Sequence, residues 1–274
     1  MNNINYKRSI VSAFFTAMYL FIIELNFNDN RLLLANLIGQ LSGAYGEIPV
    51  GFSAVELMEL SRTFFPSFIV ILMWGNDLYS LFCTASVYIF SRCNNKTRWF
   101  KKSIYILLTE IVIYEILYTS IIVLVSSLIY YIKFDLGGII MWIYHILLHS
   151  MWICICVLGI NIISVYYGST YSYICVYGIQ GLLFTLIAIS YELVNVLGSN
   201  ISNMIIRLNP ISCIILCWHN WDKYYVFYDL YEIQALKPFC SLLYLLALTI
   251  ITIYWSYKKL ITKDIIYNSI EENT

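Results

Sequence analysis

Two histidines one helical turn apart have the clearest capacity for chemistry in this sequence. His145 and His149 stand in the stretch HILLH, inside a long apolar run. Residues four apart lie on one face of a helix, where two imidazoles can share a metal ion or approach a haem. The Glu of the zinc hydrolase motif HExxH is missing from HILLH. The more ordinary role of such histidines is a hydrogen bond between helices or the lining of a polar seam.

Four acidic residues lie in or near apolar runs. A charge at the middle of a bilayer costs at least about 2.5–3.5 kcal/mol, so each carboxylate needs a specific reason to be there. Glu110 and Glu115 are five residues apart, which separates them by about 140° around a helix. We therefore expect no carboxylate pair on one face. Asp77 and Glu192 are the other two, and Glu192 is expected near water at the end of its run. All four are candidates for packing between helices, for a proton relay or for a substrate cavity.

The common enzyme motifs do not occur. The sequence has no GxxxxGK[ST] phosphate loop, no GxSxG elbow and no GxGxxG fingerprint. We therefore expect no catalytic residue, no metal centre and no cofactor bound by this chain. The formal net charge is zero, which gives no reason to expect a nucleic-acid partner.

The composition is that of a membrane protein. Charged residues make up 12% of the chain, against about 25% in a typical soluble protein. Mean hydropathy is +0.76, and several apolar runs reach about 18 residues or more. The 25 Tyr and 7 Trp residues suit two aromatic belts at the membrane surfaces.

The expected fold is therefore all-α, a single polytopic domain over residues 1–274 with six membrane-spanning helices. A bilayer crossing needs about 20 apolar residues, and the third and fourth runs exceed that length, so they should tilt or project. The six spans are expected at about 9–25, 60–79, 103–132, 138–166, 171–197 and 236–256.

Basic residues near the span ends predict the orientation, because they concentrate on the cytoplasmic side. With the N-terminus inside, that side receives ten Lys and Arg residues, and the opposite side keeps six spread over longer loops. Both termini are therefore expected in the cytoplasm. The inner set is Lys7, Arg8, Arg92, Lys96, Arg98, Lys101, Lys102, Lys258, Lys259 and Lys263, and the outer set is Arg31, Arg62, Lys133, Arg207, Lys223 and Lys237.

Short helices are expected on the outer face. In GFSAVELMEL, Ser53 followed three residues later by Glu56 fits a capping box and predicts a helix start. The stretch RLLLANLIGQL is apolar but too short to cross a bilayer. Near the end of the chain, LNPISCIILCWHNW has a breaker at Pro210 and then Trp218 and Trp221. We expect both stretches to form interfacial or re-entrant segments.

The stretch SRCNNKTRWFKK, residues 91–102, gathers five basic residues between two apolar runs and follows NDLYSLFCTASVYIFSR. This pattern resembles the cytoplasmic loop of type-2 ABC exporter permeases, at about residues 78–102. The resemblance implies a coupling helix near 79–91 that docks on a separate ATPase subunit. A cluster that only holds the loop inside the cell is the simpler alternative. The implied docking residues are Asp77, Tyr79, Arg92, Lys96, Arg98, Trp99, Lys101 and Lys102.

The resemblance also implies a function. A permease of this class pairs with a second permease, identical or related, and with a cytoplasmic ATPase that binds ATP and Mg²⁺. The small size is most like permeases of Gram-positive bacteria that expel bacteriocins, lantibiotics or other antimicrobial peptides from the plasma membrane, often for self-immunity. An outer gate is expected at Asn209, Pro210 and Trp218. The usual Glu and Gly-Thr before the coupling helix are replaced by Gly75, Asn76 and Asp77, so the subfamily stays open.

Two other functions fit the same residues. One is an intramembrane metal-binding or haem-binding protein built around His145 and His149. The other is an ion-coupled carrier that uses Glu110, Glu115 or Asp77. The carrier is less favoured because the chain lacks paired interrupted helices in two inverted halves.

Overall fold

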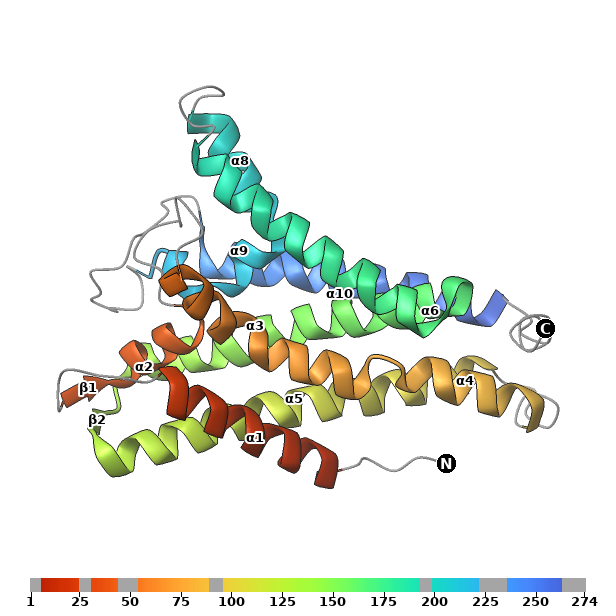
Figure 1. Ribbon diagram of the computed structural model, residues 1–274, viewed down its shortest axis with the longest axis horizontal. Coiled ribbons are helices and arrows are strands. Elements are labelled where there is room, and N and C mark those ends of the chain that lie inside the picture. Colours follow the sequence, from red (N-terminus) through yellow and green to blue (C-terminus); the bar gives the residue numbers. More distant parts are fainter. Residues whose placement is uncertain are drawn as a thin grey trace.

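The computed structural model describes residues 6–24, 31–43, 54–88, 96–192, 199–221 and 236–262. Nearly all of them are helical (Figure 1), so the predicted all-α fold is confirmed. One feature was not predicted: β1 (Arg31–Leu33) and β2 (Tyr131–Lys133) pair in parallel. The helices are α1 (Tyr6–Glu24), α2 (Leu34–Leu41), α3 (Ala54–Trp74), α4 (Asp77–Tyr88), α5 (Lys96–Ile129), α6 (Leu136–Glu192), α8 (Ser199–Leu208), α9 (Pro210–Ile214), the short 3-10 helix η1 (Leu216–Trp218) and α10 (Pro238–Thr262).

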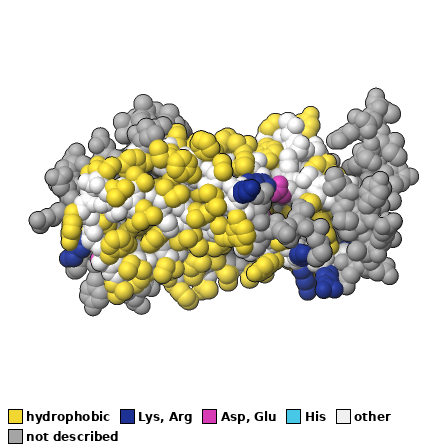
Figure 2. Space-filling view, turned by 90° about the horizontal axis from the view of Figure 1, so that it is seen from below, with side chains coloured by type: hydrophobic (Ala, Val, Ile, Leu, Met, Phe, Trp, Pro, Cys, Tyr) yellow, Lys and Arg dark blue, Asp and Glu magenta, His cyan; other side chains and the backbone are white. Residues whose placement is uncertain are grey.

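Four helical segments are long and apolar enough to cross a membrane. They are Thr63–Cys83, Lys96–Ile129, Leu136–Ile187 and Pro238–Leu260. Figure 2 shows a broad face of the molecule covered by hydrophobic side chains, with few charged ones among them. Leu128 and Ile174 are examples of large apolar side chains left exposed. A surface of this kind is suited to lipid rather than to water.

The α6 chain reverses direction at Gly168. Its φ of 79° and ψ of 167° are non-helical and lie in a region that only glycine populates readily. Ser164 Oγ donates to Ser172 Oγ at 2.8 Å, although eight residues of straight helix would separate them by about 12 Å. Gln180 Nε2 donates to Cys156 Sγ at 3.0 Å. Both pairs are centred on residue 168, so α6 is two antiparallel arms, 136–167 and 169–192. A helix break within the predicted 167–170 is confirmed, and two separate membrane crossings stay a prediction.

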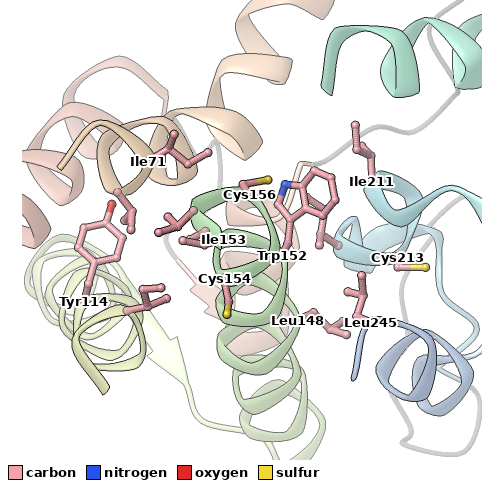
Figure 3. Packing of buried hydrophobic residues seen from close by; sticks show 14 of the residues in the cluster. Ile71, Tyr114, Leu148, Trp152, Ile153, Cys154, Cys156, Ile211, Cys213 and Leu245 are labelled. Carbon is pink, nitrogen blue, oxygen red and sulfur yellow. The ribbon is translucent and has the colours of Figure 1, made fainter. Parts of the chain in front are cut away.

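The first arm of α6 lies at the centre of the bundle and contacts several other helices. Figure 3 shows its Trp152 and Ile153 surrounded by side chains from other helices. Tyr114 comes from α5, Ile71 from α3 and Leu245 from α10, and all five side chains are buried. Between lipid-facing helices, such contacts stabilise the bundle through close packing rather than through removal of water.

The short helix expected in RLLLANLIGQL is present as α2, and most of it is buried by other parts of the protein. Its place at the membrane interface stays a prediction. Leu34, Leu37 and Ile38 are fully buried, and α2 contacts α6. Gly138 explains the close approach, because a Cβ there would lie 2.5 Å from Ala35 N. The parallel pairing of β1 with β2 brings α2 to this position.

Several helix ends meet at one end of the bundle, which we call the basic end. There α4 ends, α5 begins and α10 ends (Figure 1). Contacts join these parts: the rings of Phe100 and Tyr257 are 5.5 Å apart, and Lys259 Nζ lies 5.5 Å from the Tyr166 ring. The basic residues at these helix ends are Lys96, Arg98, Lys101, Lys102, Lys258 and Lys259. Helix α1 begins farther along the bundle, where Arg8 pairs with Asp77 at the start of α4.

Candidate functional site

A carboxylate from α5 meets the two histidines of α6 inside the bundle. Glu115, His145 and His149 are all buried, and one potential ligand atom from each lies within 4.8 Å of the others. The two imidazole rings are 4.1 Å apart with an interplanar angle of 31°. We call these three residues the Glu-His cluster. It lies within two of the candidate membrane spans.

Most polar atoms of the Glu-His cluster lack a hydrogen bond of good geometry among the residues that the structure describes, although the Tyr118 hydroxyl lies near Glu115 and the Ile214 backbone near His149. These atoms are both carboxylate oxygens of Glu115, Nδ1 of His145, and both ring nitrogens of His149. The remaining one, His145 Nε2, lies 2.6 Å from the Tyr118 hydroxyl. Buried polar atoms are nearly always bonded, and an unbonded one costs about 1–3 kcal/mol. The cluster is therefore suited to receive a ligand.

The histidine spacing predicted from HILLH is confirmed, because both rings lie side by side on one face of α6. Haem binding by both histidines does not fit this geometry. The rings are only 4.1 Å apart, which leaves no room for a porphyrin between them with an axial bond to each ring. A single metal ion against the ring edges fits better. Glu115 was singled out as an intramembrane acid, but its meeting with the histidines was not predicted.

The other intramembrane acids have different partners. Asp77 forms an ion pair with Arg8, with 2.7 Å between Oδ2 and Nη1. Trp74 Nε1 donates to Glu110 Oε2 at 2.5 Å. Glu110 and Glu115 thus serve different helix contacts, as their angular separation on α5 predicted. Glu192 is the last residue of α6, and its side chain lies outside the described part of the structure.

A helix is present where the coupling helix was predicted near 79–91: α4 runs over Asp77–Tyr88, and residues 89–91 lie outside the described part of the chain. It continues in the direction of α3 (Figure 1). Its first turn is bound to α6, because Tyr79 N donates to Asn161 Oδ1 at 2.7 Å. Just before α4, Asn76 Oδ1 lies 3.3 Å from Ser164 Oγ. The location of α4 along an inner membrane surface stays a prediction.

The expected docking residues occupy different environments. Lys101 and Lys102 are exposed, as is Arg98, and Lys96 is partly buried. Trp99 turns inward, and its ring lies 6.2 Å from the Phe82 ring of α4. Arg92 lies outside the described residues. Among the described docking residues, Lys101 and Lys102 are exposed side chains that a partner could reach.

The three expected gate residues form buried contacts around α9. Asn209 caps this helix by accepting a hydrogen bond from Ile211 N at 2.9 Å, and its Nδ2 donates to Leu183 O at 2.6 Å. Pro210 occupies the first turn, where its missing N–H is tolerated. Trp218 is buried in η1. These contacts hold α9 against the second arm of α6.

His219 was not expected at a functional site, and the structure buries it fully. Its Nδ1 donates to Ile215 O at 3.0 Å, and its Nε2 accepts from Ser241 Oγ at 2.8 Å. Burial lowers the pKa of His219 from 6.5 to about 4. The neutral ring therefore joins the segment after α9 to α10.

The structure thus assembles one polar cluster with unmet bonding capacity and one basic end. Comparison of the chain with protein-family models, with curated proteins and with solved structures finds no match. Function is therefore inferred from the residues and contacts of this chain itself.

Proposed function

We propose that this protein is the membrane-spanning permease subunit of an ATP-driven transporter of the type-2 exporter class. It crosses the plasma membrane of a bacterium six times, with both termini in the cytoplasm. The observation that carries this proposal is the basic end, where the end of α4, the start of α5 and the end of α10 come together (Figure 1). Positive charge of this kind marks a cytoplasmic face.

The contacts at the basic end suit the transmission of force. Trp99 joins the start of α5 to α4 through Phe82, and Phe100 joins it to α10 through Tyr257. The first turn of α4 is bound to the first arm of α6 at Asn161. A movement of α4 and the start of α5 would therefore reach both the first arm of α6 and α10.

The motor in this proposal is a separate cytoplasmic ABC ATPase that holds ATP and Mg²⁺. The permease pairs with a second copy or a related chain. Its substrate is an antimicrobial peptide or another amphipathic molecule, taken from the membrane or from the cavity between the permeases. Exposed apolar side chains on the second arm of α6, such as Leu182 and Ile174, supply surface for lipid or for the second permease.

The ion-coupled carrier is less favoured because two of its three candidate acids have structural partners. Asp77 is paired with Arg8, and Glu110 accepts from Trp74. Transport into vesicles driven by an ion gradient without nucleotide would support the carrier instead.

The test is a double charge reversal at the basic end, Lys101→Glu with Lys102→Glu. Both side chains are exposed, so the variant should fold. Lys133→Glu in β2, also exposed, is the matched control at the other end of the bundle. We expect wild type and the control to co-purify from native membranes with an ATPase bearing the GxxxxGK[ST] motif. The double variant should recover at least about tenfold less of it. Equal recovery by all three chains would count against docking at the basic end.

A further inference from the structure

The Glu-His cluster has a donor set that the permease function does not explain. Two imidazoles and one carboxylate converge in the buried centre of the bundle. Five of their six side-chain nitrogen and oxygen atoms lack a hydrogen bond of good geometry among the described residues, with only the Tyr118 hydroxyl near Glu115 and the Ile214 backbone near His149. A helix contact alone would be expected to satisfy these atoms, as it does for Glu110 with Trp74.

We propose that Glu115, His145 and His149 bind a divalent transition-metal ion, with zinc as the best-suited ion. Two His and one Glu form a known set of three protein ligands for zinc, which leaves a fourth position open. Mg²⁺ and Ca²⁺ prefer sites built from oxygen atoms, so the two imidazoles disfavour both. The site therefore suits a borderline-soft divalent ion that binds both imidazole nitrogen and carboxylate oxygen.

The geometry is close to what such an ion requires. Ligand atoms around tetrahedral zinc are separated by about 3.4 Å, given bonds of about 2.0–2.2 Å. The three ligand atoms here lie within 4.8 Å of one another, so small side-chain movements close the site. The Glu115 side chain comes from α5 and the histidines from α6. A bound ion would therefore join these two helices across the core.

Tyr118 prepares His145 for this role. When His145 Nε2–H donates to the Tyr118 hydroxyl oxygen, 2.6 Å away, Nδ1 keeps its lone pair for the metal. Nδ1 is also the atom of this ring without a partner among the described residues. Metal-binding histidines commonly donate their second N–H in this way, which fixes the ring and its tautomer.

The experiment uses the full chain, purified in detergent with a histidine-free tag, stripped with a chelator and loaded with Zn²⁺ alone. We expect about one zinc per chain after desalting and a rise in the melting temperature, because an ion bound only to the folded state stabilises it. Glu115→Gln and His149→Gln should each weaken binding by at least about tenfold. Glu110→Gln, which alters a buried carboxylate on the same helix outside the cluster, should bind as wild type does.

A second measurement holds even if a cluster variant fails to fold. Co²⁺ loaded into the wild-type chain should give visible bands of nitrogen and oxygen coordination without a sulfur charge-transfer band. Tyr118→Phe should retain this spectrum with affinity reduced by about tenfold. The proposal is overturned if wild type keeps no zinc, if Glu115→Gln and His149→Gln bind it unchanged, or if the Co²⁺ spectrum shows thiolate ligands. None of these results depends on recovery of an ATPase.

Discussion

Arg8 at the start of α1 forms an ion pair with Asp77 at the start of α4, at 2.7 Å between Nη1 and Oδ2. The same guanidinium lies over the Trp74 ring, 4.4 Å from its centroid. One side chain of the first helix therefore holds the junction of α3 and α4. This contact gives Asp77 a role inside the chain, which the pattern of a docking loop did not predict.

The Arg8–Asp77 pair should be measurable as a coupling free energy. We expect Arg8→Gln and Asp77→Asn each to lower the free energy of unfolding in detergent. In a double-mutant cycle, the coupling should be about 1 kcal/mol, since the pair is only partly buried. Lys7→Gln, at the neighbouring exposed position, should show no coupling to Asp77→Asn. Additive effects of Arg8→Gln and Asp77→Asn would mean that the ion pair does not stabilise the junction.

The reversal at Gly168 should not tolerate a side chain. Alanine at φ 79° and ψ 167° is strained by about 1–3 kcal/mol, so Gly168→Ala should lower the melting temperature. Gly178→Ala is the matched control on the second arm, because a Cβ there meets no atom within 4 Å. Thermal unfolding followed by size-exclusion chromatography compares the two variants. Equal melting temperatures would show that the reversal does not depend on Gly168.

His219 should make the protein sensitive to acid. Its pKa is lowered to about 4 by burial in the folded chain, whereas the unfolded chain has the ordinary value of about 6.5. Between these values only the unfolded chain takes up the proton. The stability is therefore complete above about pH 6.5 and falls as the pH falls towards 4, by at most about 3 kcal/mol.

Comparison with His219→Gln isolates this effect, because every other titrating group is common to both proteins. The variant should be less stable at neutral pH, since it loses the bonds to Ile215 and Ser241. Its melting temperature should then fall less than that of wild type between pH 7.5 and pH 4.5, two values chosen to bracket the titration. Parallel decreases would show that His219 does not titrate in this range.

Local sequence patterns predicted the helices well. The capping box at Ser53 and Glu56 predicted a start that the structure has at Ala54. The break between the fourth and fifth spans was expected within 167–170 and occurs at Gly168. Both features depend on hydrogen bonding and backbone conformation within a few residues, so a short stretch of sequence is enough to predict them.

Contacts between distant helices were not predictable in the same way. Helix α5 is apolar around most of its circumference, so no amphipathic stripe indicates which face turns towards α6. The meeting of Glu115 with His145 and His149 depends on that rotation and on packing across 30 residues or more of sequence. The inward position of α2 similarly depends on Gly138, a residue far along the chain. Apolar length alone predicted a short helix but not the residues that bury it.

The central claim is that the basic end of the bundle faces the cytoplasm. Single cysteines at Lys101 and Lys133, added to a chain otherwise lacking cysteine, can be labelled with a membrane-impermeant maleimide in intact and permeabilised cells. We predict that Lys133→Cys is labelled in intact cells and that Lys101→Cys is labelled only after permeabilisation. Labelling of Lys101→Cys in intact cells would contradict the orientation and the docking of an ATPase at this end.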